Sequence, residues 1–178
     1  MSRIGKRPIK VIQGVKVSFK ERQLSVKGPK GELELTAHPA IELKIDDENI
    51  YVSPADLNGP MTPMLGTTWA LITNMIHGVT EGYRKSVEFM GSGITPDLQG
   101  KTLIIEAGFS HKVPMEPLEG TSFTRDGNIV HVDGISKQQV GQQAALIRRV
   151  RPPSGYRAQG IKYTDEQPKY KAGKARTA

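Results

Sequence analysis

Residues 65–72, with the sequence LGTTWALI, and residues 140–147, with the sequence VGQQAALI, decide the fold. Both have the apolar spacing of an amphipathic helix, and Gly, Ala, Leu and Ile occupy the same places in each. Two unrelated helices can share four residues by chance. Here an Asn-Ile pair precedes each helix, at Asn49-Ile50 and Asn128-Ile129, and the order of hairpins, strand and helix is shared as well. A duplication is therefore favoured.

The rest of each half predicts strands around its helix. Alternating apolar and polar residues predict strands at 15–19, 24–27, 32–35, 41–45 and 49–52 in the first half, and at 86–89, 102–106, 112–116 and 128–132 in the second. A tight turn is expected at Gly28-Pro29-Lys30-Gly31 and a loop at residues 91–96, because Gly and Pro favour turns.

Both helices have recognisable ends. Thr62 is expected to cap the first helix, Pro63 to be its first residue and Gly78 to end it. The second helix begins at the capping box Ser136-Lys137-Gln138-Gln139 and stops before Pro152-Pro153, because a residue that precedes proline avoids the helical region. Its core side is expected to carry Val140, Ala144, Ile147 and Val150.

These elements predict an α+β chain of two tandem duplicated domains, each an antiparallel sheet packed against one helix. An N-terminal α+β domain with a basic N-terminal arm is expected at residues 1–82. A second α+β domain is expected at residues 83–155, followed by a basic C-terminal tail at residues 156–178.

The net charge of +7 over 178 residues is unevenly spread. Residues 137–178 hold ten Lys/Arg against two acidic residues, a net charge of +8, and residues 1–10 carry +4, which leaves −5 for the body. A solvated face is the ordinary explanation of a charge run. Two basic ends on a mildly acidic body are instead typical of a protein that binds nucleic acid.

Partners other than nucleic acid are less well supported as an explanation of the basic charge. An anionic membrane would also attract it, but no apolar run approaches the roughly 18 residues of a spanning helix, and no lipidation motif is present. The N-terminal residues are too polar for a secretory signal. The absence of cysteine fits a reducing cytoplasm, where we expect the protein to act.

No motif supports catalysis, a metal site or a cofactor. The four histidines (His38, His77, His111 and His131) show no metal-ligand spacing, and there is no cysteine to complete a site. Gly91-Ser92-Gly93 is followed by Pro96 where a dinucleotide fingerprint needs glycine. We expect no enzyme activity and no small-molecule substrate.

The C-terminal region contains residues of the types that bind RNA. Arg148, Arg149 and Arg151 end the second helix, where cations also complement the helix dipole, so a structural role is an alternative. Beyond them, tyrosines alternate with basic residues, and aromatic faces can stack on bases while cations meet phosphates. Core packing is an equal alternative for Tyr156 and Tyr163, whereas Tyr170 lies in a polar stretch.

Several stretches, taken in order, resemble one family. They are SRIGKRPI at 2–9, VKGPKG at 26–31, Asn74-Met75 with Gly78-Val79 and Gly82-Tyr83, GFSH at 108–111, KQQVGQ at 137–142 and RPPSGYRAQGIKY at 151–163. Together they resemble the large-subunit ribosomal protein L-six family of the bacterial type, over nearly the whole chain. The chain departs from the family at Arg157 and Gln159, where lysines are usual, and at residues 91–96, where a Gly-Val-Gly-Tyr-Arg-like run is usual.

The resemblance implies a structural constituent of the large ribosomal subunit. Such a protein binds large-subunit ribosomal RNA near the factor-binding, sarcin–ricin region, with ribosomal proteins beside it and translation factors nearby. The charge pattern and the resemblance together single out the following candidate RNA-binding residues: Arg3, Lys6, Arg7, His111, Lys112, Lys137, Arg148, Arg149, Arg151, Tyr156, Arg157, Lys162, Tyr163, Lys169, Tyr170, Lys171, Lys174 and Arg176.

Two alternatives remain open at this point. An RNA-binding assembly or processing factor outside the ribosome would keep the basic tail without needing the family motifs in order. An RNA-acting enzyme would need a cluster of titratable residues that the sequence does not reveal.

Overall fold

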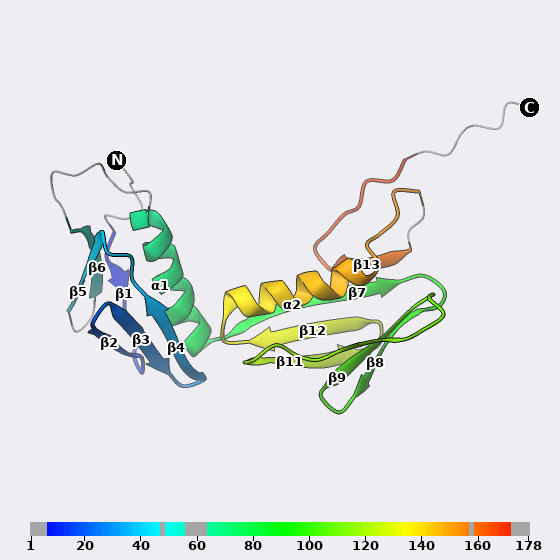
Figure 1. The fold of residues 1–178 in the computed structure, drawn as a ribbon, viewed down its shortest axis with the longest axis horizontal. Coiled ribbons are helices and arrows are strands. Elements are labelled where there is room, and N and C mark those ends of the chain that lie inside the picture. Colours follow the sequence, from blue (N-terminus) through cyan, green and yellow to red (C-terminus); the bar gives the residue numbers. More distant parts are fainter. Residues whose placement is uncertain (1–6, 47–48, 56–63, 157–158, 172–178) are drawn as a thin grey trace, which may run out of the picture. The chain divides into compact units, whose positions relative to one another are not determined.

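The computed structural model describes residues 7–46, 49–55, 64–156 and 159–171, and the chain forms two compact units. The N-terminal unit takes in the chain up to Gly82 together with Ile135–Lys137, and the C-terminal unit takes in the remainder. Each unit contains one helix and antiparallel strands (Figure 1). The predicted α+β fold of two duplicated halves is confirmed, and the strands of each unit are divided between two sheets.

The N-terminal unit has two three-stranded sheets and the helix α1. The first sheet, in the order β1-β6-β5, consists of β1 (Ile9–Lys10), β6 (Asn49–Pro54) and β5 (Ile41–Ile45). The second, in the order β2-β3-β4, consists of β2 (Lys16–Lys20), β3 (Gln23–Gly28) and β4 (Gly31–Thr36). Helix α1 spans Met64–Thr80. Leu24 and Val26 of β3 share one hydrophobic core with Ile72 and Val79 of α1, and all four are fully buried.

The first helix ends later than the sequence predicted. Gly78 is buried inside α1, which continues to Thr80, so the expectation that Gly78 ends the helix is wrong. The chain leaves the helix at Gly82, whose φ of 79° is a left-handed conformation that glycine adopts readily. The amides of Glu81 and Gly82 both donate to the carbonyl of His77, at 2.9 and 3.2 Å. Thr62 and Pro63, expected at the start of this helix, lie outside the described residues.

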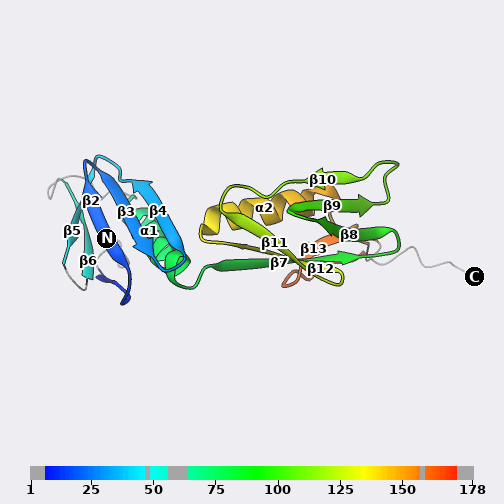
Figure 2. The same ribbon diagram turned by 90° about the horizontal axis from the view of Figure 1, so that it is seen from below.

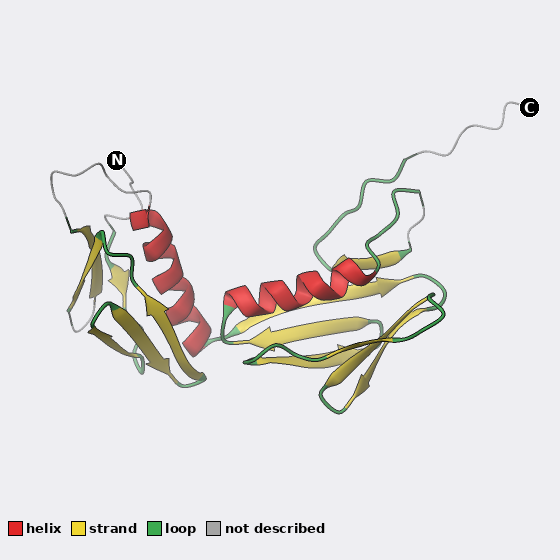
Figure 3. Cartoon of the chain, viewed as in Figure 1, coloured by secondary structure: helices red, strands yellow, loops and turns green. Residues whose placement is uncertain are grey.

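The C-terminal unit has a four-stranded and a three-stranded sheet and the helix α2. The first sheet, in the order β11-β12-β7-β13, consists of β11 (Thr121–Asp126), β12 (Ile129–Gly134), β7 (Tyr83–Met90) and β13 (Gly160–Tyr163). The second, in the order β10-β9-β8, consists of β10 (Val113–Met115), β9 (Thr102–Ala107) and β8 (Ile94–Gln99). Helix α2 spans Lys137–Val150 and lies along the four-stranded sheet (Figure 3).

The two units repeat one topology. The sheet β1-β6-β5 has its counterpart in β7-β12-β11, the hairpins β2-β3-β4 have theirs in β8-β9-β10, and each helix follows the middle strand of its sheet, β6 or β12. Strand β13 is the exception. It pairs with the other side of β7, and the N-terminal unit has no counterpart to it among the described residues (Figures 1 and 2).

The helices match residue by residue in burial as well as in sequence. Leu65 and Val140 are buried at the aligned position, as are Ile72 and Ile147. The aligned polar pair Thr68 and Gln143 is buried too. The predicted core side of α2 is confirmed, because Val140, Ala144 and Ile147 are buried and Val150 packs half-buried against the same core.

The strands before the helices match with a shift of one residue. Ile50 and Val52 are buried in β6, whereas in β12 the buried residues are Val130 and Val132. The counterpart of Ile50 is therefore Val130, and Ile129 is only half-buried. The Asn-Ile pairs thus mark equivalent strands without marking equivalent positions in them.

The region expected as a loop at residues 91–96 is a turn followed by a strand. Ile94 and Pro96 are buried in β8, where they pair with Ala107 and Ile105 of β9, so the loop expectation is wrong for residues 94–96. Proline is tolerated there because β8 is the edge strand of its sheet, where a missing N–H breaks no ladder on the outer side.

Gly28 packs against the end of α1 without room for a side chain. A Cβ at this position would lie 2.7 Å from Val79 Cγ2 and 2.8 Å from the Val79 carbonyl oxygen. Val79 is fully buried, and its carbonyl accepts the amide of Lys30 at 3.0 Å, so it has little freedom to move. We therefore expect Gly28→Ala to lower the free energy of unfolding by about 1–3 kcal/mol, measured by urea denaturation.

Gly141→Ala is the matched control for this substitution. Gly141 lies in the exposed part of α2, and nothing stands within 4 Å of its added Cβ. Alanine should there stabilise the helix by up to about 1 kcal/mol. Equal unfolding midpoints for Gly28→Ala and the wild type would contradict the packing argument.

Candidate nucleic-acid interface

One end of the C-terminal unit brings together three segments. They are the loop between β9 and β10, the chain that follows α2 and the chain that follows β13. The carbonyl of Ala107 accepts a hydrogen bond from Arg151, and the carbonyl of Gly155 accepts one from the amide of Lys171 at 2.8 Å. We call these residues the basic end: Phe109, His111, Arg149, Arg151, Tyr156, Lys169, Tyr170 and Lys171.

Arg151 is held in place at the basic end rather than projecting freely. Its Nη1 donates to the Ala107 carbonyl, and its guanidinium lies 5.9 Å from the centre of the Phe109 ring. The path of the loop depends on Gly108, which has a φ of 69° and whose added Cβ would lie 2.5 Å from Arg151 Nη1. Arg151 therefore offers its remaining N–H groups from a fixed position.

Phe109 is a site residue that the sequence did not single out. Its side chain is 49% exposed, and its ring is nearly parallel to that of His111, with 5.9 Å between ring centres. A phenylalanine in a short loop between two hairpin strands was the available signal, because such a loop offers little apolar surface to cover a large ring.

Tyr156 and Tyr170 are exposed at the basic end, and the core-packing alternative for Tyr156 does not hold. Tyr156 is 69% exposed, with Lys171 Nζ 5.8 Å from its ring centre. Arg149 and Lys169 are exposed, and within the described part of the chain neither has a carboxylate partner.

Three of the candidate RNA-binding cations are neutralised inside the unit. Arg148 forms a bidentate ion pair with Glu166, in which Nε and Nη2 donate to the two carboxylate oxygens at 2.7 and 2.6 Å. Lys162 lies 3.2 Å from Glu88, and Lys112 lies 2.7 Å from Glu106. The hydrogen bonds from Arg148 and from Lys112 lower the pKa of Glu166 and of Glu106, so both carboxyl groups stay ionised.

Tyr163 packs against the core, as the core-packing alternative predicts. It is half-buried on β13, with Lys85 Nζ 4.9 Å and the Arg148 guanidinium 5.6 Å from its ring centre. Lys85 also binds Asp165 at 2.8 Å, which lowers the pKa of that carboxyl group. Tyr163 thus anchors the segment that follows β13.

The remaining candidate residues lie away from the basic end or outside the described residues. Arg7 is exposed in the N-terminal unit, where its carbonyl accepts a hydrogen bond from Trp69 Nε1 at 2.9 Å. Lys137 is exposed on the first turn of α2. The candidates outside the described residues are Arg3, Lys6, Arg157, Lys174 and Arg176.

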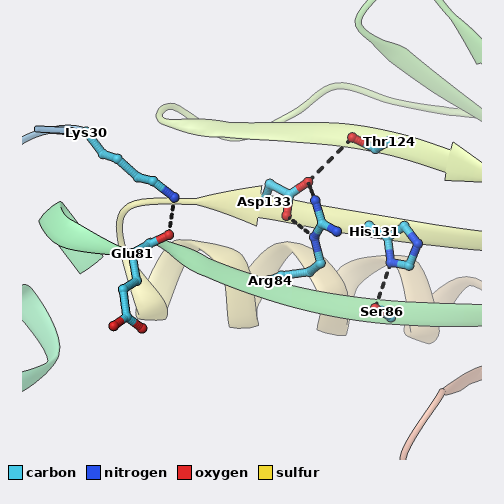
Figure 4. A network of polar contacts seen from close by, with 7 residues as sticks. All are labelled: Lys30, Glu81, Arg84, Ser86, Thr124, His131 and Asp133. Atoms are coloured by element: carbon cyan, nitrogen blue, oxygen red, sulfur yellow. Dashed lines mark hydrogen bonds and ion pairs between the residues drawn. The ribbon is translucent and has the colours of Figure 1, made fainter. Parts of the chain in front are cut away.

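The sheet of the C-terminal unit also carries a polar network that crosses β7, β12 and β11. Arg84 donates to both carboxylate oxygens of Asp133, at 2.6 and 3.1 Å, and Thr124 donates to the same group at 3.4 Å (Figure 4). Two residues further along each strand, Ser86 and His131 lie 2.7 Å apart. The cation of this network has its own counter-charge, unlike Arg149 and Lys169. In the N-terminal unit, Lys30 donates to the Glu81 carbonyl in the same view.

The described residues contain no group of three or more His, Cys, Asp or Glu placed to hold a metal ion. None of the helices they form is long and apolar enough to cross a membrane. The basic end presents exposed cations, and an arginine held by a backbone carbonyl, beside exposed aromatic rings. This arrangement is suited to phosphate and nucleobase contact.

Comparison with known proteins identifies the family to which the chain is similar. The chain matches the family Ribosomal protein L6 at residues 11–82 and again at residues 90–164. It is 43% identical to the large ribosomal subunit protein uL6 of Persephonella marina over 176 residues, which covers 98% of each chain. It is 44% identical to the proteins of the same name from Parasynechococcus marenigrum and Chloroflexus aggregans, again with 98% of each chain covered.

The Arg148–Glu166 pair should stabilise the C-terminal unit in a pH-dependent way. Because the pKa of Glu166 is lowered by folding, its contribution is fully present above the ordinary glutamate value of about 4.3 and is lost as pH falls through the lower, folded value. Glu166→Gln should cost about 1–2 kcal/mol at neutral pH, because these hydrogen bonds are charge-assisted and only partly exposed.

Urea denaturation from pH 7 down to about pH 3 checks this expectation. The gap between wild type and Glu166→Gln should close toward the acid end. Glu119→Gln, at an exposed glutamate of the same unit, is the control and should match the wild type throughout. A gap independent of pH would show that the pair is not its source.

Proposed function

This chain belongs to the ribosomal protein L6 family of the large ribosomal subunit, and on this premise we propose that its basic end binds large-subunit ribosomal RNA near the factor-binding, sarcin–ricin region. The proposal is carried by one observation. Cations without a carboxylate partner among the described residues occur together with exposed aromatic rings where three segments of the C-terminal unit meet. Elsewhere in that unit Arg84, Lys85 and Arg125 each face a carboxylate, and Lys101, in the turn between β8 and β9, is an exception. The family is not one of enzymes, and binding is sufficient to account for such a site.

The division between paired and unpaired cations ranks the candidate residues. A phosphate that approaches Arg148, Lys162 or Lys112 must compete with a carboxylate already in contact. Arg149, Lys169 and Lys171 have no such competitor within the part of the chain that the structure describes, so each can neutralise a phosphate and release its counterions. We assign the main contacts to the basic end, and secondary contacts to the basic N-terminal arm, to Lys137 and to the basic residues after 171.

The mechanism is positional rather than catalytic. Cations that neutralise phosphates where RNA segments converge stabilise one local RNA fold, which translation factors then meet on the subunit surface. Specificity comes from the shape of the RNA more than from base edges in a duplex, because the deep groove of an RNA helix excludes side chains. Neighbouring ribosomal proteins complete the surroundings, in the cytoplasmic ribosome.

Strand β13 determines how the proposal should be tested. Removing everything after residue 156 would also remove β13 and its fully buried Ile161, and so would damage the sheet together with the charge. Substitutions at exposed cations separate the two effects. We expect Arg149→Gln, Lys169→Gln and Lys171→Gln combined to weaken binding to a large-subunit RNA fragment that contains the sarcin–ricin hairpin. The plot of log affinity against log salt concentration should become shallower by about 2–3 units.

The matched control carries the same change in charge at the N-terminal unit. Lys16→Gln, Lys20→Gln and Lys44→Gln remove three exposed lysines from that unit and should leave the slope near that of the wild type. An equal loss of slope in both triple variants would indicate a general charge effect and contradict the assignment to the basic end. Equal wild-type affinity for an unrelated structured RNA of the same length would contradict the proposed target.

A further inference from the structure

The exposed ring of Phe109 has no role in the stability of the C-terminal unit that would explain its position. It is about half exposed at 49%, it lies outside the buried core cluster, and it carries no polar atom that would profit from water. Exposing so large an apolar side chain costs free energy in proportion to its area. The ring is nevertheless held in an ordered arrangement by its neighbours, which points to a partner.

The neighbours of the ring define what that partner can be. His111 lies nearly parallel to Phe109, and the Arg151 guanidinium lies 5.9 Å from its centre, tethered to the carbonyl of Ala107. Both groups lie over the Phe109 ring and still leave the side chain 49% exposed, so an aromatic ligand can stack on its uncovered part with their nitrogen donors beside it. Ser110 and Lys112, next to them in the chain, are exposed and polar, so the ring is not part of a wider apolar patch.

We propose that Phe109, flanked by His111 and Arg151, is a stacking site for a single unpaired nucleobase of RNA. This inference rests on the proposed function and specifies what one part of the basic end binds. A protein interface would need a contiguous core of apolar contacts, which Phe109 between the exposed polar residues Ser110 and Lys112 and the hydroxyl-bearing rings of Tyr156 and Tyr170 do not supply. A nucleobase needs only one flat face and polar groups at its rim.

The ligand is an unpaired nucleotide rather than a duplex. Bases inside an A-form helix are already stacked on both faces, so only a base in a loop, a bulge or an end can add an aromatic side chain to its stack. The exposed cations of the basic end supply phosphate contacts to the same RNA. The site therefore predicts recognition of a splayed base within structured RNA.

Gly108 gives the site its geometry. A side chain at this position would displace the end of Arg151, because the added Cβ would lie 2.5 Å from Nη1. Gly100 has a similar φ, 64° against 69°, but nothing lies within 4 Å of its added Cβ. Gly108→Ala and Gly100→Ala thus replace glycines of similar positive φ, and only Gly108→Ala disturbs Arg151.

The central experiment measures binding of Phe109→Leu and Phe109→Trp to the sarcin–ricin hairpin fragment, with 2-aminopurine placed at its unpaired positions in turn. Phe109→Leu should bind about 5- to 100-fold more weakly with an unchanged salt slope, because stacking is lost and phosphate contacts remain. Phe109→Trp should retain the affinity. Quenching of 2-aminopurine at one unpaired position should occur with wild type and Phe109→Trp and disappear with Phe109→Leu.

Two controls accompany this experiment. Tyr51→Leu removes another exposed aromatic ring, from β6 of the N-terminal unit, and should leave RNA affinity unchanged. Gly108→Ala should weaken binding while Gly100→Ala should not, although both lose similar stability in urea. This second pair keeps the inference testable even where Phe109→Leu loses solubility.

The outcomes separate this inference from the proposed function. Failure of the wild-type protein to prefer the large-subunit fragment would overturn the proposed function. Normal preference in the wild type with unchanged affinity and quenching in Phe109→Leu would overturn the stacking site alone. Normal RNA binding by Phe109→Leu combined with its loss from sedimenting large subunits would assign Phe109 to a protein contact and would also overturn the stacking site.

Discussion

The pairing of β13 with β7 is the constraint on which the basic end depends. Ile161 is fully buried opposite Phe89, and its amide donates to the carbonyl of Arg151 at 2.7 Å. Burying an isoleucine contributes about 1.5–3 kcal/mol, which offsets the entropy lost when an otherwise polar segment is ordered. The chain after α2 is therefore tied to the sheet at Arg151. Gly160 allows the close approach, because an added Cβ would lie 2.6 Å from Pro153 Cα.

The basic residues of the C-terminal unit fall into two groups. Some stabilise the protein through ion pairs, and the others remain available to a partner. Arg148 and Lys85 hold Glu166 and Asp165, which fixes the segment after β13 against the rest of the unit. The cations that remain, such as Arg149 and Lys169, are thereby presented on a fixed scaffold. A total count of basic residues does not distinguish these two groups, because both lie in the same run of sequence and differ only in what the fold places beside them.

Periodic features of the sequence predict a large part of this structure. The apolar spacing of the two helices and their shared residues identify the duplication, because each buried face repeats with the helical period. Strand β13 could not be found this way, since its only fully buried apolar side chain is Ile161 in a polar stretch. The strand at residues 94–99 was hidden by the glycines before it and by Pro96, which only an edge position accommodates. Likewise, the Arg148–Glu166 pair and the exposure of Phe109 follow from tertiary contacts that no local pattern encodes.

The position of β13 after the other elements has a consequence for biosynthesis. Every other strand and both helices among the described residues precede residue 151, so the sheet of the C-terminal unit is complete only when the chain has been made through Tyr163. A nascent or prematurely terminated chain that lacks β13 can contain both helices and still not position Arg151 and Tyr156. Synthesis of β13 after both helices thus makes translation past Tyr163 a condition for presenting the basic end.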